Sequence, residues 1–209
     1  MEMNCHIIRY ECIDSTNIEA RRCLDKLDNM SVLVADMQTA GRGQGDHKWH
    51  SRPGENLTFS VVARFGGSSP LAPLEVRDSL LITQVITLAL RLLLESYGLE
   101  VRIKWPNDIY IGDRKICGIL IENVLSGSQV AASIIGVGLN VNQNVFPPDL
   151  PNPVSLSLLT GRNYELDEVL ARFCALFCEC AEKTNTAEGR RYLDESFNKY
   201  MFRLPGDQR

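Results

Sequence analysis

The sequence lacks an apolar run long and clean enough to cross a membrane. The best candidate, residues 80–94, is interrupted by two threonines, a glutamine and an arginine, whereas a spanning helix needs about 20 mostly apolar residues. The amino-terminal residues also lack a cationic segment followed by an apolar one, so they do not have the pattern of a secretory signal. We therefore expect no membrane partner.

Positive charge is scarce as well. The 22 Lys and Arg residues are outnumbered by 26 Asp and Glu residues, which leaves a net charge of -4. A general basic surface for nucleic acid is thereby excluded, although a local cationic site is still compatible with this balance. We expect no nucleic-acid partner.

Metal-ligand spacing and disulfide patterns are also missing. The three histidines, at positions 6, 47 and 50, have no spacing typical of a metal site, so we expect them at the surface. The seven cysteines are odd in number and scattered, which favours reduced thiols in a cytoplasmic protein. Cys174 and Cys178 lie four residues apart on an apolar helix face, where core packing is expected.

The 209 residues, 44% of them hydrophobic, suffice for one large globular domain. Alternation, Val- and Leu-rich segments and a hairpin-like turn at residues 112–114 predict strands near residues 7–8, 31–37, 57–63, 101–105, 108–111, 115–124 and 130–141. Helical spacing predicts helices over residues 17–27, 78–97, 166–183 and 188–201, the first opened by a capping box of Thr16 and Glu19. Strands and helices alternate too irregularly for a doubly wound sheet. The fold class is therefore α+β, with a mixed, largely antiparallel sheet and helices packed on one face.

A glycine-rich stretch is the first candidate for chemistry. Gly41, Gly43 and Gly45 surround Arg42, and glycines let backbone N–H groups approach an anion that arginine can bind. It is no Walker A loop, because no Gly-Lys-Ser or Gly-Lys-Thr follows. For the glycines alone, a flexible hairpin loop is the simpler interpretation.

A second candidate spans residues 104–108 (KWPND). Pro106 removes a donor from the ladder and opens the sheet, so Lys104 and Asp108 could meet there and serve phosphate binding and proton handling. The alternative is an exposed salt bridge at a strand end.

Two further strands contain glycines. In residues 113–122, alternation places Lys115 on the face of Cys117, opposite Gly118 and Glu122, and Gly118 marks either a close approach by a ligand or a bulge. In residues 136–142, two glycines leave room for a flat ring. There Asn140 could read an adenine edge, or could simply cap the strand end.

Taken together, these stretches resemble the catalytic domain of biotin–protein ligases, a class II synthetase-like fold shared with lipoate ligases. The resemblance rests on the order and spacing of residues 14–17 (DSTN), 38–43 (QTAGRG), Trp49, 104–108 (KWPND), 118–122 (GILIE) and 136–140 (GVGLN). It implies that biotin attacks the α-phosphate of ATP, with magnesium balancing the triphosphate, and that a lysine of a biotin carboxyl carrier domain then attacks the biotinyl-adenylate.

The resemblance also implies roles for individual residues. Those implied to bind biotin are Ser15, Thr16, Asn17, Gln38, Arg42, Gly43, Gln44, Lys104 and Gly118. Those implied to bind ATP are Arg42, Trp49, Lys104, Asn107, Lys115 and Asn140. Those implied to be catalytic are Lys104, Arg42 and Asp108, the last by orienting or deprotonating the acceptor lysine. The metal ligands and the oligomeric state stay open, with a homodimer as one option.

The sequence departs from the family pattern in three places. Residues 44–46 (QGD) replace a region where many members have a second arginine, so loop closure is expected to be less cationic. The resemblance covers a catalytic domain, and we expect no winged-helix DNA-binding domain before it and no repressor role. We expect the catalytic domain to occupy residues 1–203 and residues 204–209 to be the start of a carboxy-terminal barrel that is otherwise absent.

Two alternatives stay open. A lipoate–protein ligase would share the fold and the adenylation, but its head-group pocket should be apolar, unlike residues 15–17 with Gln38. A non-catalytic biotin-binding regulator is the other, and the intact Lys104 and Arg42 argue against it.

Overall fold

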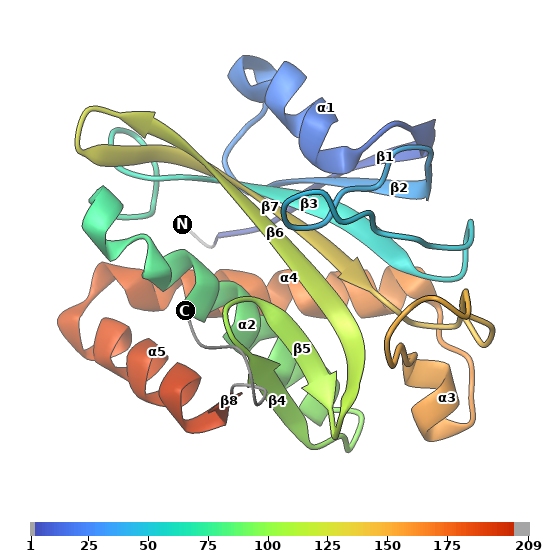
Figure 1. The fold of residues 1–209 in the computed structure, drawn as a ribbon. Coiled ribbons are helices and arrows are strands. Elements are labelled where there is room, and N and C mark those ends of the chain that lie inside the picture. Colours follow the sequence, from blue (N-terminus) through green and yellow to red (C-terminus); the bar gives the residue numbers. More distant parts are fainter. Residues whose placement is uncertain (1–2, 203–209) are drawn as a thin grey trace.

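The computed structural model describes residues 3–202 and contains one eight-stranded sheet (Figure 1). Its strands are β1 (His6–Ile13), β2 (Ser31–Gln38), β3 (Leu57–Arg64), β4 (Val101–Lys104), β5 (Asp108–Ile111), β6 (Arg114–Ser126), β7 (Gln129–Leu139) and β8 (Met201–Phe202). Their spatial order is β1-β2-β3-β7-β6-β5-β4-β8. Among the strand pairs of residues 3–202, only the two outermost, β1 with β2 and β4 with β8, run parallel. The predicted mixed, largely antiparallel sheet is confirmed.

Helices cover the two faces of this sheet unequally. The α-helices are α1 (Thr16–Arg22), α2 (Leu80–Glu95), α3 (Leu156–Thr160), α4 (Leu166–Glu182) and α5 (Ala187–Tyr200). The three long helices, α2, α4 and α5, pack on one face as predicted, whereas the short α1 lies on the other (Figure 1). On that second face Ala20 forms a small cluster with Leu33, Val62 and Ile134.

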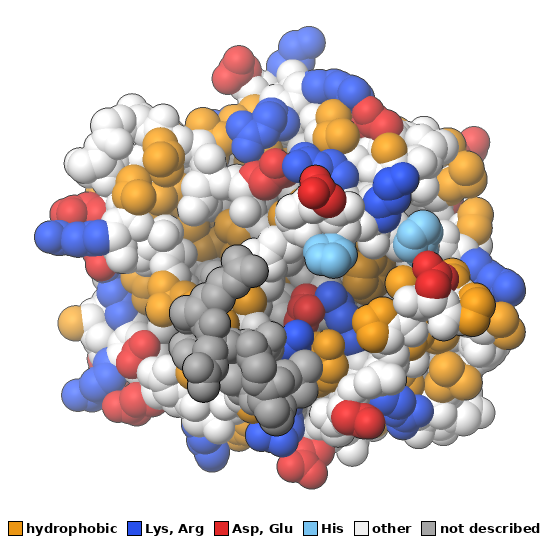
Figure 2. Space-filling view, viewed as in Figure 1, with side chains coloured by type: hydrophobic (Ala, Val, Ile, Leu, Met, Phe, Trp, Pro, Cys, Tyr) orange, Lys and Arg blue, Asp and Glu red, His pale blue; other side chains and the backbone are white. Residues whose placement is uncertain are grey.

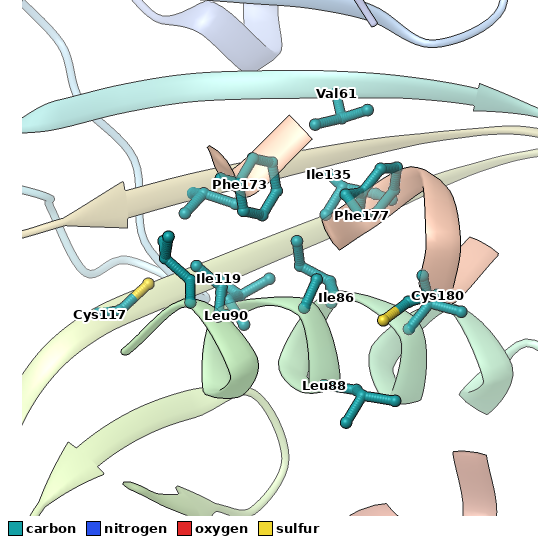
Figure 3. Close-up of a cluster of buried hydrophobic side chains, with 14 of the residues drawn as sticks. Val61, Ile86, Leu88, Leu90, Cys117, Ile119, Ile135, Phe173, Phe177 and Cys180 are labelled. Carbon is teal, nitrogen blue, oxygen red and sulfur yellow. The ribbon is translucent and has the colours of Figure 1, made fainter. Parts of the chain in front are cut away.

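The main core lies between the sheet and the three long helices. Figure 3 shows Phe173 and Phe177 of α4 between the sheet residues Val61 and Ile135 and the α2 residue Ile86. Helix α2 is apolar nearly all round because it lies between the sheet, α4 and α5. Cys174 and Cys178 are buried in this core, as predicted.

Several local predictions need correction. The helix predicted over residues 17–27 ends at Arg22 and is followed by a short 3-10 turn, Leu24–Lys26. Two short 3-10 turns, Val76–Asp78 and Lys183–Asn185, precede α2 and follow α4. Helix α3 and strand β8 had no predicted counterpart, because five and two residues are too few to show a period.

Within residues 3–202, none of the helices has the length and apolar character that crossing a membrane requires. The segment predicted to begin a barrel, residues 204–209, lies outside the described residues. The domain boundary at residue 203 stays a prediction.

Candidate active site

A cleft of about 490 Å³ opens on the sheet face that carries α1. Figure 2 shows acidic and basic side chains meeting in a hollow near the middle of one face of the molecule. The cleft is lined by every residue predicted to bind or react: Ser15, Thr16, Asn17, Gln38, Arg42, Gly43, Gln44, Trp49, Lys104, Asn107, Asp108, Lys115, Gly118 and Asn140. The structure thus brings together stretches that are more than 100 residues apart in sequence.

The start of α1 forms one end of this cleft. Ser15 is the helix N-cap and makes no capping hydrogen bond with its side chain. The backbone N–H of Thr16 donates to Gln38 Oε1 at 2.8 Å, and the Thr16 hydroxyl lies 3.2 Å from the same oxygen. The predicted capping box of Thr16 and Glu19 is therefore wrong, because the Thr16 side chain is engaged across the sheet rather than along the helix.

Ser60 and Glu122 support this end. Ser60 was not predicted to belong to the site, and Glu122 lies in a predicted candidate stretch but was given no role. Ser60 Oγ lies 2.7 Å from Thr16 Oγ1 and 2.6 Å from Asn17 Oδ1. Asn17 Nδ2 donates to Glu122 Oε2 at 2.9 Å. The available signal was the alternation of β3: its apolar residues face the core, so polar Ser60 had to face the other side.

The floor of the cleft is bare backbone on β6 and β7. Gly118 and Gly138 are directly paired, and Gly136 lies two residues before Gly138 on β7. A Cβ at Gly136 would lie 2.2 Å from Asn17 Oδ1, and one at Gly138 would lie 2.2 Å from Trp49 Cε2. The glycines do leave room for a flat ring, and the indole of Trp49 occupies it.

The glycine-rich stretch forms a small hydrogen-bonded hairpin. The Gly43 N–H donates to the His47 carbonyl at 2.8 Å and the Trp49 N–H to the Gly41 carbonyl at 3.1 Å. A Cβ at Gly41 would lie 2.5 Å from the Trp49 carbonyl oxygen, so glycine is required at that position. From this hairpin Arg42 Nη1 reaches Glu122 Oε1 at 3.2 Å.

The other end of the cleft carries the lysines. Lys104 and Asp108 are partners in the β4–β5 ladder, so the two residues do meet where the sheet opens at Pro106. The Asp108 carboxylate also pairs with Lys115, with Oδ2 2.8 Å from Nζ. Trp105 anchors this corner, because its N–H donates to the Phe202 carbonyl of β8 at 3.1 Å.

Lys115 lies on the opposite side of its strand from the predicted one. Its side chain approaches the Gly118 position, where a Cβ would be 3.3 Å from Nζ, while Cys117 is fully buried. The reason is a bulge: Tyr110 pairs with Lys115 and Ile109 with Cys117, so Ile116 is an extra residue and also faces the core. Simple alternation across residues 115–118 was therefore the wrong rule.

Two asparagines hold loops at the cleft rim. Asn140 is buried, and its Nδ2 donates to the Val154 carbonyl at 3.0 Å. Asn107 Nδ2 donates to the Ile119 carbonyl. Both residues line the cleft while supporting its walls, so contact between Asn140 and adenine stays a prediction.

One wall comes from a segment interpreted in the sequence only as a proline-rich break. Phe146, Leu150, Pro151 and Pro153 line the cleft. The segment is tied to β6, because the Lys115 N–H donates to the Asn152 carbonyl at 2.8 Å. Proline spacing carries no information about which strand such a loop will cover, so no sequence signal pointed to this contact.

The cysteines and histidines contribute little chemistry. Burial raises the pKa of the Cys117 thiol and raises that of Cys180 to about 12, so both stay protonated at neutral pH. The three histidines are exposed, as predicted. Across residues 3–202, no three His, Cys, Asp or Glu side chains are grouped so that they could hold a metal ion.

Two ligases from bacteria are similar in sequence to this chain. The bifunctional ligase/repressor BirA of Bacillus subtilis is 33% identical over 179 residues, which cover 84% of this chain and 53% of that protein. The biotin--[acetyl-CoA-carboxylase] ligase of Paracoccus denitrificans is 30% identical over 178 residues, covering 83% of this chain and 72% of that protein. The chain spans about half the length of the Bacillus relatives it matches.

The fold also has solved relatives. Biotin protein ligase from Aquifex aeolicus, in complex with biotin and ATP, matches with a TM-score of 0.78 and 27% identity over 94% of this chain and 78% of that chain. The sequence profile of the biotin/lipoate A/B protein ligase family matches residues 10–140, more than half of the chain. The chain therefore belongs to the biotin/lipoate A/B protein ligase family.

Proposed function

We propose that the chain is an ATP-dependent biotin–protein ligase. In the first step a biotin carboxylate oxygen attacks the α-phosphate of ATP, and pyrophosphate leaves. In the second step a lysine amine of a biotin carboxyl carrier domain attacks the carbonyl of the biotinyl-adenylate, and AMP leaves. The observation that carries the proposal is a single cleft with a hydrogen-bonding end at residues 15–17 and a cationic end at Lys104 and Lys115. The biotin and ATP of the Aquifex aeolicus complex support it.

The hydrogen-bonding end suits a ureido group, which offers one carbonyl and two N–H groups. Gln38 Oε1 already accepts from Thr16, so the Gln38 amide NH₂ is the group that can donate to the ureido carbonyl. The Ser15 hydroxyl makes no capping bond and is a second candidate. Both protons of Asn17 Nδ2 are used, by Glu122 and by the Leu120 carbonyl, so Asn17 can act only through Oδ1, as an acceptor. Thr16 and Asn17 thereby also shape the pocket.

The remaining residues follow the length of the cleft. Arg42, Gly43, Gln44 and Gly118 would surround the biotin carboxylate, and Lys104 would stabilise the charge that builds up on the α-phosphate. At the nucleotide end we assign ATP contacts to Trp49, Asn107, Lys115 and Asn140.

Asp108 would orient the incoming acceptor lysine. Its carboxylate is paired with Lys115 and can still accept a hydrogen bond from an amine.

Mg²⁺ would bind together with ATP rather than as a resident metal of the protein. Asp108 is a carboxylate that lines the cleft, and Mg²⁺ commonly binds through one or two carboxylates and the substrate phosphates. The ion would balance the triphosphate charge.

We further propose residues 1–203 as the catalytic domain, a cytoplasmic location, a carboxylase carrier domain as acceptor and no nucleic-acid partner. The net charge of -4 supports the last of these. A homodimer stays one option for its oligomeric state.

Pyrophosphate release tests the reaction directly. The purified protein with MgATP should release pyrophosphate when biotin is added, and far less when lipoate replaces it, because the Thr16, Asn17 and Gln38 side chains favour a polar head group. Mass spectrometry of a carboxylase carrier domain should then show one added biotinyl group. Equal release with lipoate would favour the lipoate ligase alternative, and no release with either acid from a folded protein would support a non-catalytic regulator.

Arg42→Gly should loosen the loop over the intermediate. With three glycines in residues 41–45 the hairpin is costly to order, and Arg42 ties it to β6. We expect the loop to be mobile without ligand and ordered with it. The variant should still form adenylate but lose it roughly tenfold faster, the scale of one charge-assisted hydrogen bond. Rapid filtration measures the adenylate that the protein retains, and labelling of lysines on unrelated proteins measures the adenylate that it releases.

Arg77→Gly is the matched control, because Arg77 is exposed and does not line the cleft. It should retain the adenylate as the parent does. An Arg42→Gly protein that holds its intermediate equally long would refute a closing role for Arg42.

A further inference from the structure

Glu122 connects the head-group end of the cleft with the glycine-rich hairpin. Its carboxylate is divided between two partners: Oε2 accepts from Asn17 Nδ2 at 2.9 Å, and Oε1 lies 3.2 Å from Arg42 Nη1. Asn17 belongs to the head-group end and follows β1, whereas Arg42 belongs to the glycine-rich hairpin and follows β2. Glu122 itself does not line the cleft.

The contact with Asn17 fixes the orientation of an amide. Asn17 Oδ1 faces Ser60, while Nδ2 faces Glu122 and the Leu120 carbonyl. Turning the amide over would place Oδ1 against a carboxylate and a carbonyl, both of which can only accept hydrogen bonds. Glu122 therefore holds the one orientation in which the Asn17 oxygen can also accept from a ligand.

The contact with Arg42 is different in kind. The Arg42 side chain is 43% exposed and that of Glu122 21% exposed, so solvent weakens this ion pair. Such a pair can position the hairpin without locking it, and a ligand carboxylate or phosphate can compete for the guanidinium. The Glu122 carboxylate therefore contacts both the hairpin, through Arg42, and the head-group pocket, through Asn17.

We propose that Glu122 is a positioning residue that couples the head-group pocket to the glycine-rich hairpin. Seating of a polar head group against Asn17 and closure of Arg42 over the ligand both depend on the position of the same side chain. This inference rests on the proposed function, since it names a regulation of that site.

Biotin affinity in a set of variants tests the coupling. Asn17→Ala, Arg42→Ala and the double variant are measured by calorimetry, first with Glu122 present and then in a Glu122→Gln background. With Glu122, we expect the product of the two single losses to differ from the loss in the double variant by roughly threefold or more. With Glu122→Gln, which keeps an acceptor for Asn17 but removes the charge that holds Arg42, that factor should fall to about one.

Conservative variants separate positioning from general support of the fold. Arg42→Lys keeps the cation that pairs with Glu122, so the cycle of Asn17→Ala with Arg42→Lys should give a factor of about one. The cycle with Arg42→Gln should give the same factor of roughly threefold as Arg42→Ala, because the cation is lost. Neither test requires a change at Glu122. The control Glu11→Gln removes the same charge from an exposed position and should leave the coupling intact.

The outcomes distinguish the inference from the function on which it rests. A parent protein that does not bind biotin overturns the proposed function. A parent that binds biotin, with coupling that survives Glu122→Gln or is equal for Arg42→Lys and Arg42→Gln, overturns the positioning role alone.

Discussion

Lys104→Ala is expected to slow formation of the biotinyl-adenylate by about 10² or more, the scale of losing one preorganised group that stabilises developing charge. Lys104 ends β4 beside Asp108, at the corner where the sheet opens into the cleft. In the proposed reaction, a cation held there would face the α-phosphate on which negative charge accumulates. Biotin affinity should fall less, because the head-group contacts lie at the other end. Rapid-quench measurement of pyrophosphate release in a single turnover, beside calorimetry with biotin, checks both parts.

Arg102→Ala is the matched control for this change. Arg102 lies two residues earlier on the same strand, is exposed, and does not line the cleft. It should leave adenylation near the parent rate. If Lys104→Ala adenylates as fast as Arg102→Ala, Lys104 has no role in the chemical step.

Gly136→Ala should damage the head-group pocket as strongly as removing a ligand contact. The new Cβ would lie 2.2 Å from Asn17 Oδ1, so the asparagine must leave the position that Ser60 and Glu122 give it. Overpacking of this kind costs about 1–3 kcal/mol, which corresponds to a loss in biotin affinity of roughly tenfold to a hundredfold. Calorimetry with biotin and denaturant unfolding measure the two consequences.

Gly138→Ala and Ala131→Ser serve as comparisons. At Gly138 the clash falls on Trp49 rather than on Asn17, so ATP affinity should fall more than biotin affinity. Ala131→Ser adds one atom to the same strand outside the cleft and should change neither. Equal effects of both glycine substitutions on both ligands would contradict the division of the cleft into two ends.

Much of the site could be predicted because its residues occur in short stretches whose order is specific. Residues 14–17, 38–43 and 104–108 all reach one cleft. The strands were predictable where alternation is regular, as in β3, and α2 was predictable because a helix apolar on all sides must be buried.

What could not be predicted depends on contacts between distant segments. The bulge at Ile116 moves Lys115 to the other face of the sheet, and no local pattern marks the extra residue. Thr16 has the spacing of a helix cap, but its hydrogen bonds are made with Gln38 and Ser60 from neighbouring strands. Glu122 follows the apolar residues 119–121 of β6, and only the fold places it between Asn17 and Arg42.

The glycine floor has a consequence for how this cleft can evolve or be engineered. At Gly118, Gly136 and Gly138 any substitution adds atoms, and the existing neighbours stand within 2.9 Å of each new Cβ. Substitutions at the floor can therefore only fill the cleft, whereas Phe146 and Leu150 in the wall can be replaced by smaller or larger side chains. A library that seeks to accept biotin analogues should hold the three glycines constant and place its diversity in the wall, where the backbone imposes no such one-way restriction.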